Sequence, residues 1–172
     1  MVLEGAGKRT WAEIEAATGI GQSELISAKV YEDAVTLNLI ECAAGCVGGE
    51  VAQFMTDFGQ YWIAYAERGS FGPILQFTGE DIATFLRNLD RLHDSVETVM
   101  PDARMPSFKV LSEEPGSLVV AYQSDRTGLE PFVKGLLIGL LVSFNLAGTV
   151  SSVASEGARA IFRLTFVPGA RT

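Results

Sequence analysis

The pattern of apolar residues in this chain changes after Pro101, and this change limits the folds that the chain can adopt. Before Pro101, apolar side chains recur at every third or fourth position, which is typical of amphipathic helices. After it, residues 107–125 form two alternating runs around a Pro-Gly turn, the signature of a β-hairpin. A helical stretch, about 128–144, and a second alternating pair, about 149–168, complete the pattern.

The predicted fold is therefore of the α+β class. A helical N-terminal part, about residues 1–100, is expected to pack on a C-terminal part, about residues 101–168. The C-terminal part follows the order β-β-α-β-β and contains a four-stranded antiparallel sheet and one helix. With 172 residues, of which 48% are hydrophobic, the chain has the size of a single domain over residues 1–172 and enough apolar material for a sizeable core.

The charge of the chain excludes some partners. A formal net charge of −8 and a sequence pI of about 4.6 argue against a nucleic-acid-binding face. The most apolar stretch, residues 135–144, has about half of the ~20 residues that a membrane span requires. The first residues contain no apolar run typical of a signal peptide. We therefore expect a cytoplasmic protein that binds neither nucleic acid nor membrane.

The two cysteines, Cys42 and Cys46, lie four residues apart on a predicted helix, so they can share one face of it. Two thiols alone do not complete a zinc site. We expect them to be buried structural residues in a reducing compartment.

His93 is the only histidine, and it lies on a predicted helix from about Asp81 to Val99 that Thr78 is expected to cap. It follows Leu89 by four residues, so it points into the apolar stripe of this helix. One interpretation is a histidine at the edge of the core whose partner is a backbone carbonyl. The other is a metal ligand: one imidazole cannot build a hydrolytic zinc site, but it is what a haem iron requires.

Tyr122, Ser124 and Arg126 fall at alternate positions of a predicted strand, so their side chains are expected on one face. All three are hydrogen-bond donors, and together they suit a dianionic edge such as a pair of haem propionates. The alternative is that they form the solvated outer face of an edge strand.

The combination of these features resembles a known family. The segments "FLRNLDRLHDSV", "MPDARMPSFKV" and "SLVVAYQSDRTGLEPFVKGLLIG" occur in the order and at the spacing of the haem–nitric oxide/oxygen-binding (H-NOX) domain family, which includes the haem domain of soluble guanylate cyclase. The similarity extends upstream through "FMTDFGQYWIAYAERGSFGPIL" and covers most of the chain. The resemblance implies an H-NOX-like α+β fold and haem b as the cofactor.

The resemblance also assigns roles to individual residues. It implies that His93 is the proximal ligand of the haem iron, and that Tyr122, Ser124 and Arg126 bind the propionates. Pro106 matches the proline of the family that presses on the porphyrin and distorts it. No residue is expected to be catalytic.

The resemblance further predicts which gases bind. Family members that hold oxygen stably carry a distal tyrosine as a hydrogen-bond donor, and the matching position here is Pro131. We therefore expect binding of nitric oxide and CO without stable binding of oxygen, unless Tyr61, Trp62 or Tyr65 supplies a donor. Family members usually begin about ten residues earlier, so the distal wall is expected to differ.

The function that the resemblance implies is a haem-based gas sensor and not an enzyme. Nitric oxide at ferrous haem would change the conformation, and a separate effector would read the change. From the family, the expected effector is a histidine kinase or a cyclic-di-GMP enzyme. Two alternatives stay open: a haem enzyme that consumes nitric oxide or peroxide, and a module of this fold that has lost haem and binds another apolar ligand.

Overall fold

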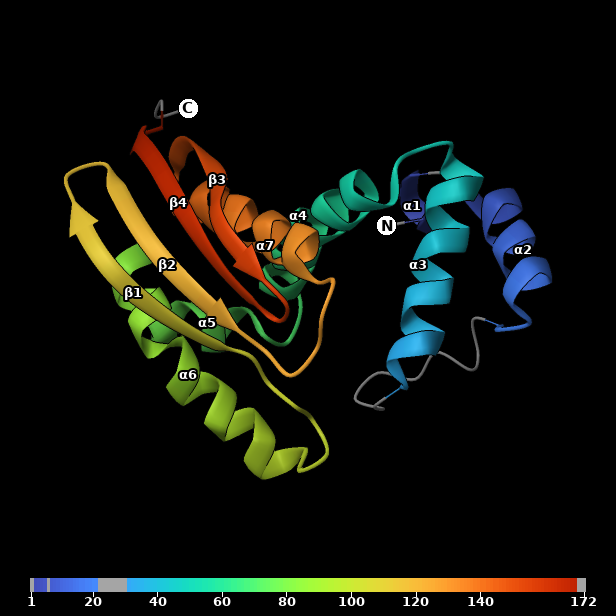
Figure 1. The fold of residues 1–172 in the computed structure, drawn as a ribbon, viewed down its shortest axis with the longest axis horizontal. Coiled ribbons are helices and arrows are strands. Elements are labelled where there is room, and N and C mark those ends of the chain that lie inside the picture. The colour runs from blue at the N-terminus through green and yellow to red at the C-terminus, as the bar shows by residue number, and fades with distance from the viewer. Residues whose placement is uncertain (1, 6, 22–30, 170–172) are drawn as a thin grey trace.

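The computed structural model describes residues 2–5, 7–21 and 31–169. In chain order the elements are α1 (Val2–Gly5), α2 (Gly7–Thr18), α3 (Asp33–Val47), α4 (Val51–Arg68), α5 (Gly72–Thr78), α6 (Ile82–Val99), β1 (Ser107–Glu114), β2 (Ser117–Gln123), α7 (Glu130–Ser143), β3 (Leu146–Glu156) and β4 (Arg159–Pro168). The α+β class and the order β-β-α-β-β after the helical part are confirmed (Figure 1).

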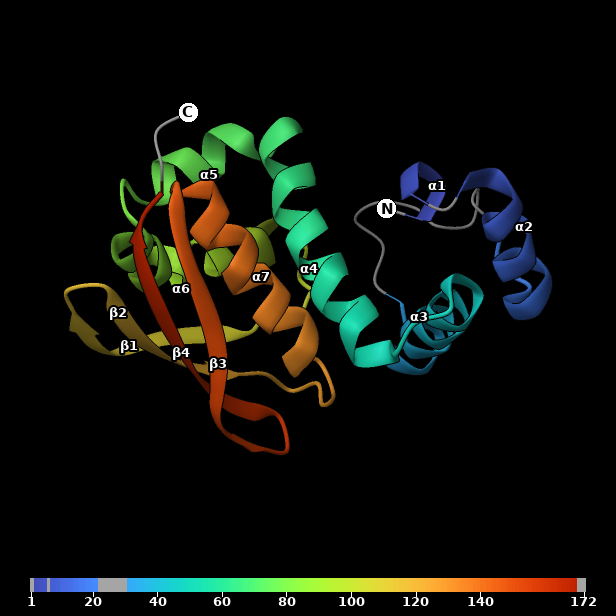
Figure 2. The ribbon, with the colours of Figure 1, turned by 90° about the horizontal axis from the view of Figure 1, so that it is seen from above.

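The four strands form one antiparallel sheet in the order β1-β2-β4-β3. Both hairpins are local, and the two central strands pair β2 with β4, opposing Val120 and Phe162. Alternate residues of these strands are buried, as the alternating sequence predicts. Helices α6 and α7 cover this buried face of the sheet (Figures 1 and 2).

The described residues contain two separate apolar cores. The larger core joins the sheet to α6 and α7 and includes the fully buried Leu86, Leu137 and Phe162. The smaller core lies among α2, α3 and the first turn of α4, around Ile14 and Phe54. Helices α1, α2 and α3 stand to one side of the sheet, and α4 connects them to the rest (Figure 1). We call α1, α2 and α3 the N-terminal lobe.

Helix α4 packs on α7 almost backbone to backbone. A Cβ added to Gly135 would lie 2.0 Å from the Thr56 carbonyl oxygen, and one added to Gly59 would lie 2.3 Å from the Phe132 carbonyl oxygen. Any larger residue at either position would therefore push the helices apart. The Thr56 hydroxyl also donates to the Pro131 carbonyl at 3.1 Å.

The described part of the chain contains no single helix that is long and apolar enough to span a membrane. Helices α3 and α4 together reach that length and composition, but they are bent by 101° at the break between them.

Candidate functional site

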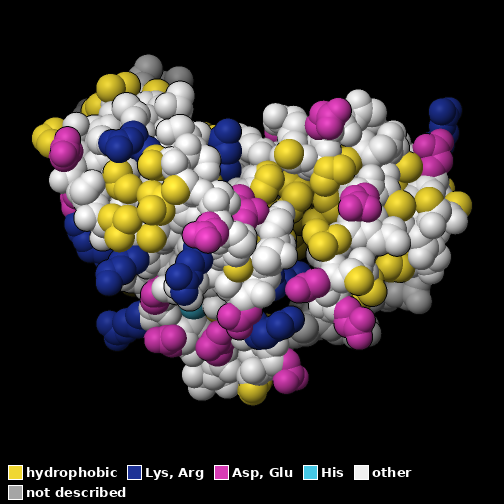
Figure 3. Space-filling view, viewed as in Figure 1, with side chains coloured by type: hydrophobic (Ala, Val, Ile, Leu, Met, Phe, Trp, Pro, Cys, Tyr) yellow, Lys and Arg dark blue, Asp and Glu magenta, His cyan; other side chains and the backbone are white. Residues whose placement is uncertain are grey.

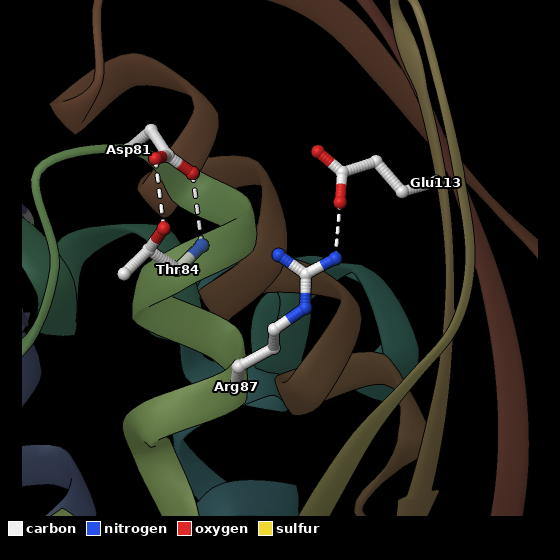
Figure 4. A network of polar contacts seen from close by, with 4 residues as sticks. All are labelled: Asp81, Thr84, Arg87 and Glu113. Carbon is white, nitrogen blue, oxygen red and sulfur yellow. Dashed lines mark hydrogen bonds and ion pairs between the residues drawn. The ribbon is translucent and has the colours of Figure 1, made fainter.

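Helix α6 is fixed at its start by a side-chain cap. The Asp81 carboxylate accepts hydrogen bonds from the Thr84 amide and the Thr84 hydroxyl, each at 2.8 Å (Figure 4). These bonds lower the pKa of Asp81. The predicted cap at Thr78 is wrong, because its hydroxyl donates to the Ile74 carbonyl within α5 instead. Six residues after the cap, Arg87 pairs with Glu113 of β1 and ties the helix to the sheet (Figure 4).

His93 lies half-buried on α6, and its ring has one fixed partner. Its Nδ1 lies 2.7 Å from the Pro106 carbonyl oxygen. A carbonyl only accepts, so Nδ1 must carry the proton of the neutral ring, and the lone pair is then on Nε2. Burial is the largest influence on this ring and lowers the pKa of His93, which favours the neutral form. The arrangement combines both interpretations of the sequence, since the ring has a carbonyl partner and still offers one nitrogen to a metal.

The chain that carries Pro106 is fastened to the same helix by Asp90, three residues before His93. One oxygen of the Asp90 carboxylate accepts from the Phe108 amide at 2.7 Å, and the other accepts from the Ser107 hydroxyl at 2.6 Å. The Phe108 ring then lies between two predicted site residues, with centroids 6.1 Å from His93 and 5.4 Å from Tyr122. The structure thus connects His93, Pro106 and Tyr122 into one local cluster.

Tyr122 faces the core and not the solvent. It lies on β2, which is an inner strand of the sheet, and only 3% of its surface is exposed. Burial raises the pKa of the Tyr122 phenol, while a hydrogen bond with Ser124 lowers it. The alternative interpretation, a solvated face of an edge strand, is therefore wrong for this residue.

Ser124 and Arg126 lie beyond the strand, because β2 ends at Gln123. The prediction that all three donors share one strand face is wrong. The Ser124 hydroxyl instead accepts from the Arg126 amide at 3.1 Å, a turn that fixes the loop locally. The motif is thus one buried phenol at the end of a strand followed by an ordered loop.

The guanidinium of Arg126 reaches the N-terminal lobe. Its Nε lies 2.6 Å from a carboxylate oxygen of Asp33, the first residue of α3. The same Nε is buried and makes no well-directed hydrogen bond within the described residues, so the contact is a close charge pair with poor alignment of the N–H. A buried cationic donor that is not fully satisfied is suited to a further carboxylate, such as a propionate.

Candidate metal ligands do not cluster in the described part of the chain. No three His, Cys, Asp or Glu residues gather there in a way that could hold a metal ion. Cys42 and Cys46 are free and half-buried, so full burial was predicted wrongly, and the Cys42 thiol donates to the Asn38 side chain at 3.3 Å. Apolar side chains gather where the N-terminal lobe meets the rest of the molecule (Figure 3), as a large flat hydrophobe would require.

Comparison with known proteins decides the family. The family model described as haem-NO-binding matches residues 1–152. The chain belongs to the H-NOX family. Among curated relatives, "Soluble guanylate cyclase gcy-35" of Caenorhabditis elegans is 29% identical over 145 residues, which are 80% of this chain and 20% of that protein. "Soluble guanylate cyclase gcy-31" of the same organism is 26% identical over 134 residues, 78% and 19% respectively. The chain thus spans about a fifth of these relatives.

Solved H-NOX structures have the same fold. A mutant form of an H-NOX protein from S. oneidensis, in the Fe(II) ligation state, superposes with a TM-score of 0.84 at 18% identity, covering 99% of this chain and 92% of that one. The Fe(II) unliganded H-NOX protein from K. algicida gives a TM-score of 0.80 at 20% identity, with coverage of 99% and 93%. H-NOX domains form a family of haem-based gas sensors that bind nitric oxide, and the domains themselves are not catalytic.

On the side of the predicted distal pocket, Pro131 lies in the first turn of the H-NOX helix α7. Its ring has no donor, and its carbonyl is bonded to Thr56. The three aromatic residues of α4 that were considered as donors differ in exposure. Trp62 is 38% and Tyr65 55% exposed, whereas Tyr61 is half-buried and stacks on Tyr65 with ring centroids 6.1 Å apart.

Sequence reasoning missed two acidic residues of this H-NOX site. Asp90 has a signal in the sequence, because it precedes His93 by three residues and so shares its face of the helix. Asp33 has none, since it is 93 residues away from Arg126 in the chain and the two meet only in the folded structure.

Proposed function

We propose that this chain is a haem-based sensor of nitric oxide that binds ferrous haem b through His93. The observation that supports the proposal is the contact of His93 with the Pro106 carbonyl, because it favours the tautomer with the proton on Nδ1 and a free lone pair on Nε2. The haem, when bound, supplies the iron at which a diatomic gas binds. Tyr122, Ser124 and Arg126 are proposed to hold its propionates, and Pro106 to press on the porphyrin.

The gases that bind are proposed to be nitric oxide and CO. An Fe–O₂ unit is polar and gains from a hydrogen-bond donor, whereas nitric oxide and CO depend much less on one. Pro131 offers no donor, and Trp62 and Tyr65 are exposed on α4. Stable binding of oxygen is therefore not expected, unless the half-buried Tyr61 supplies a donor.

The signal is proposed to act on a separate protein in the cytoplasm, a histidine kinase or a cyclic-di-GMP enzyme. A ligand shifts a conformational equilibrium only by the difference between its affinities for the two states. Here α6 carries the iron ligand and is tied to β1, while the N-terminal lobe has its own core. Release of His93 from the iron would therefore move the two regions relative to each other, and a partner protein would recognise the changed surface.

The test is an absorption spectrum of the purified protein reconstituted with haemin and reduced without oxygen. We expect a five-coordinate ferrous Soret band that does not change with oxygen and shifts with nitric oxide and CO. Absence of any Soret band would overturn the proposal and favour a module for another apolar ligand. Continuous turnover of nitric oxide or peroxide, in place of stoichiometric binding, would favour a haem enzyme.

A variant pair tests the residue assignments. His93→Gly should lose the protein–iron bond, and added imidazole should restore the wild-type spectrum. Arg126→Ala should weaken haem retention more than it alters the Soret position. An unchanged spectrum in His93→Gly would show that another residue holds the iron.

A further inference from the structure

Four consecutive residues, the last two of the loop after α6 and the first two of β1, are each bonded to one face of α6. The Met105 amide donates to Glu97, the Pro106 carbonyl accepts from His93, and the Ser107 hydroxyl and Phe108 amide donate to Asp90. The three helix residues are spaced by three and four positions, so they form a single stripe. Side chains of α6 therefore hold residues 105–108 along the length of the helix.

Glu97 makes the bond on the loop side of Pro106. Its Oε1 accepts from the Met105 amide at 2.9 Å, in a partly buried position. The loop turns tightly before this point, with the Met100 amide bonded to the Val96 carbonyl and the Ala103 amide bonded to the Met100 carbonyl. Met105 is thus the first residue after the turn whose amide is held by a side chain of α6.

The position of Pro106 depends on its neighbours to an unusual degree. Proline has no N–H, so its backbone can be held only through its carbonyl. That carbonyl bonds to His93, the proposed iron ligand, so the position of the proline affects the orientation of the imidazole ring. Glu97 holds the residue before Pro106 and Asp90 holds the residues after it. Loss of Glu97 would free one of these two anchors.

We propose that Glu97 is a positioning residue of the haem site, which acts by holding the Met105 amide and so fixing Pro106 against His93. The proposal rests on the proposed function, since it concerns the residues that would hold the haem. Glu97 does not need to touch the cofactor. Its effect passes through two backbone groups, the Met105 amide and the Pro106 carbonyl.

Three variants separate this bond from the charge of Glu97. Glu97→Ala removes both the acceptor and the charge, and alanine suits the interior of a helix. Glu97→Gln removes the charge but keeps an oxygen that can accept from the Met105 amide. Asp94→Ala is the matched control, because Asp94 also lies near His93 and influences its charge, but its side chain has no bond to the loop among the described residues.

The first measurement uses the haem-free protein and does not depend on any cofactor. Amide hydrogen exchange at Met105, followed by NMR, should be about tenfold faster in Glu97→Ala than in the wild type, because a hydrogen bond to a charged acceptor is lost. The rate in Glu97→Gln should lie between those of the wild type and Glu97→Ala, because a neutral amide oxygen is a weaker acceptor than a carboxylate, and the rate in Asp94→Ala should stay within about twofold of the wild type. Equal exchange rates at Met105 in all four proteins would show that Glu97 does not hold this amide, and the proposal would be wrong.

The second measurement uses the ferrous, haem-loaded protein. Haem transfer to apomyoglobin should be about tenfold faster for Glu97→Ala, and the iron–histidine stretching band in the resonance Raman spectrum should shift or broaden. Glu97→Gln should restore part of the wild-type behaviour, because it keeps an acceptor for the Met105 amide without the charge. If Glu97→Ala matches the wild type here, or if Asp94→Ala and Glu97→Gln change as much as Glu97→Ala, the positioning role is wrong while the proposed function stands. If the wild type takes up no haem, both the positioning role and the proposed function are wrong. Hydrogen exchange at Met105 would still show whether its amide is bonded to Glu97.

Discussion

The two ends of this molecule are held together in different ways. On the side of α6 and β1, polar side chains of one helix bond to consecutive residues of the neighbouring chain, above a core that includes the fully buried Leu86. The N-terminal lobe has a small core around Ile14 and is joined to the rest by α4 and by the pair Arg126–Asp33. An arrangement of this kind favours a fixed region around His93 and a lobe that can change its position.

The two cores should unfold in separate transitions if the N-terminal lobe is only loosely joined to the rest. Leu86→Ala should lower the free energy of unfolding of the larger core by about 4 kcal/mol, since a fully buried leucine leaves a cavity. Ile14→Ala, also fully buried, should act on the N-terminal lobe alone. In a Trp62→Phe background, fluorescence of Trp11 reports the lobe and far-UV circular dichroism reports the whole chain during urea unfolding. A single shared transition in both variants would mean that the cores are one cooperative unit.

Gly135→Ala tests whether α4 belongs to the body that contains the sheet. The added methyl group would overlap the Thr56 carbonyl, so we expect a loss of about 3 kcal/mol in unfolding free energy. Gly45→Ala is the matched control, because a Cβ there would meet no atom within 4 Å and the change should be neutral or slightly stabilising. Similar stabilities of the two variants, measured by urea titration, would contradict the close packing of α4 on α7.

A smaller effect should appear with pH, and only on the ligand side. The pKa of His93 is lowered from its ordinary value of 6.5, so the unfolded chain binds the proton more readily than the folded protein. Stability of the haem-free protein is therefore full above pH 6.5 and should fall as the pH decreases through the range below it. His93→Gln should remove this part of the slope. Because His93 is the only histidine, the Trp11 transition of the N-terminal lobe should not follow pH in this range.

The smallest effect is expected for the pair that joins the two regions. The Arg126 and Asp33 side chains are 30% and 41% exposed, so a double-mutant cycle of Asp33→Asn with Arg126→Ala should give a coupling below about 1 kcal/mol in the haem-free protein. Haem binding should reduce this coupling further if the propionates pair with the Arg126 guanidinium in place of Asp33. A coupling of several kcal/mol in urea unfolding would show that the lobe is firmly locked in place.

The sequence predicted the architecture well because each element has a strong local pattern. The alternating residues around Pro115 and Gly116 specify a hairpin, and the spacing of Leu86, Leu89 and His93 specifies a helix with His93 at its apolar edge. These patterns depend on periods of two and of about 3.6 residues, which survive in any tertiary context.

The parts of the site that could not be predicted depend on distance in three dimensions. The alternating pattern predicted that the strand continues to Arg126. In the structure β2 ends at Gln123, because the Ser124 hydroxyl accepts from the Arg126 amide and forms a turn there. Thr78 was predicted to cap α6, but its hydroxyl bonds to Ile74 within α5, and Asp81 caps the helix instead. Asp33 contacts Arg126 across 93 residues, and no local pattern indicates such a pair.

The close packing of α4 on α7 also has a consequence for the order of folding. The Thr56–Pro131 bond closes a loop of 75 residues that contains α5, α6, β1 and β2, and so contains His93, Pro106 and Tyr122. Contacts between residues so far apart in the chain form after local ones, because closing a long loop lowers the chain entropy before the contact can stabilise the structure. The hairpins and the helix that carries His93 should therefore form first, and α4 should dock late. During synthesis, the N-terminal lobe would leave the ribosome early. It could pack on the rest of the molecule only after α7 has been made, because α4 joins the two through α7.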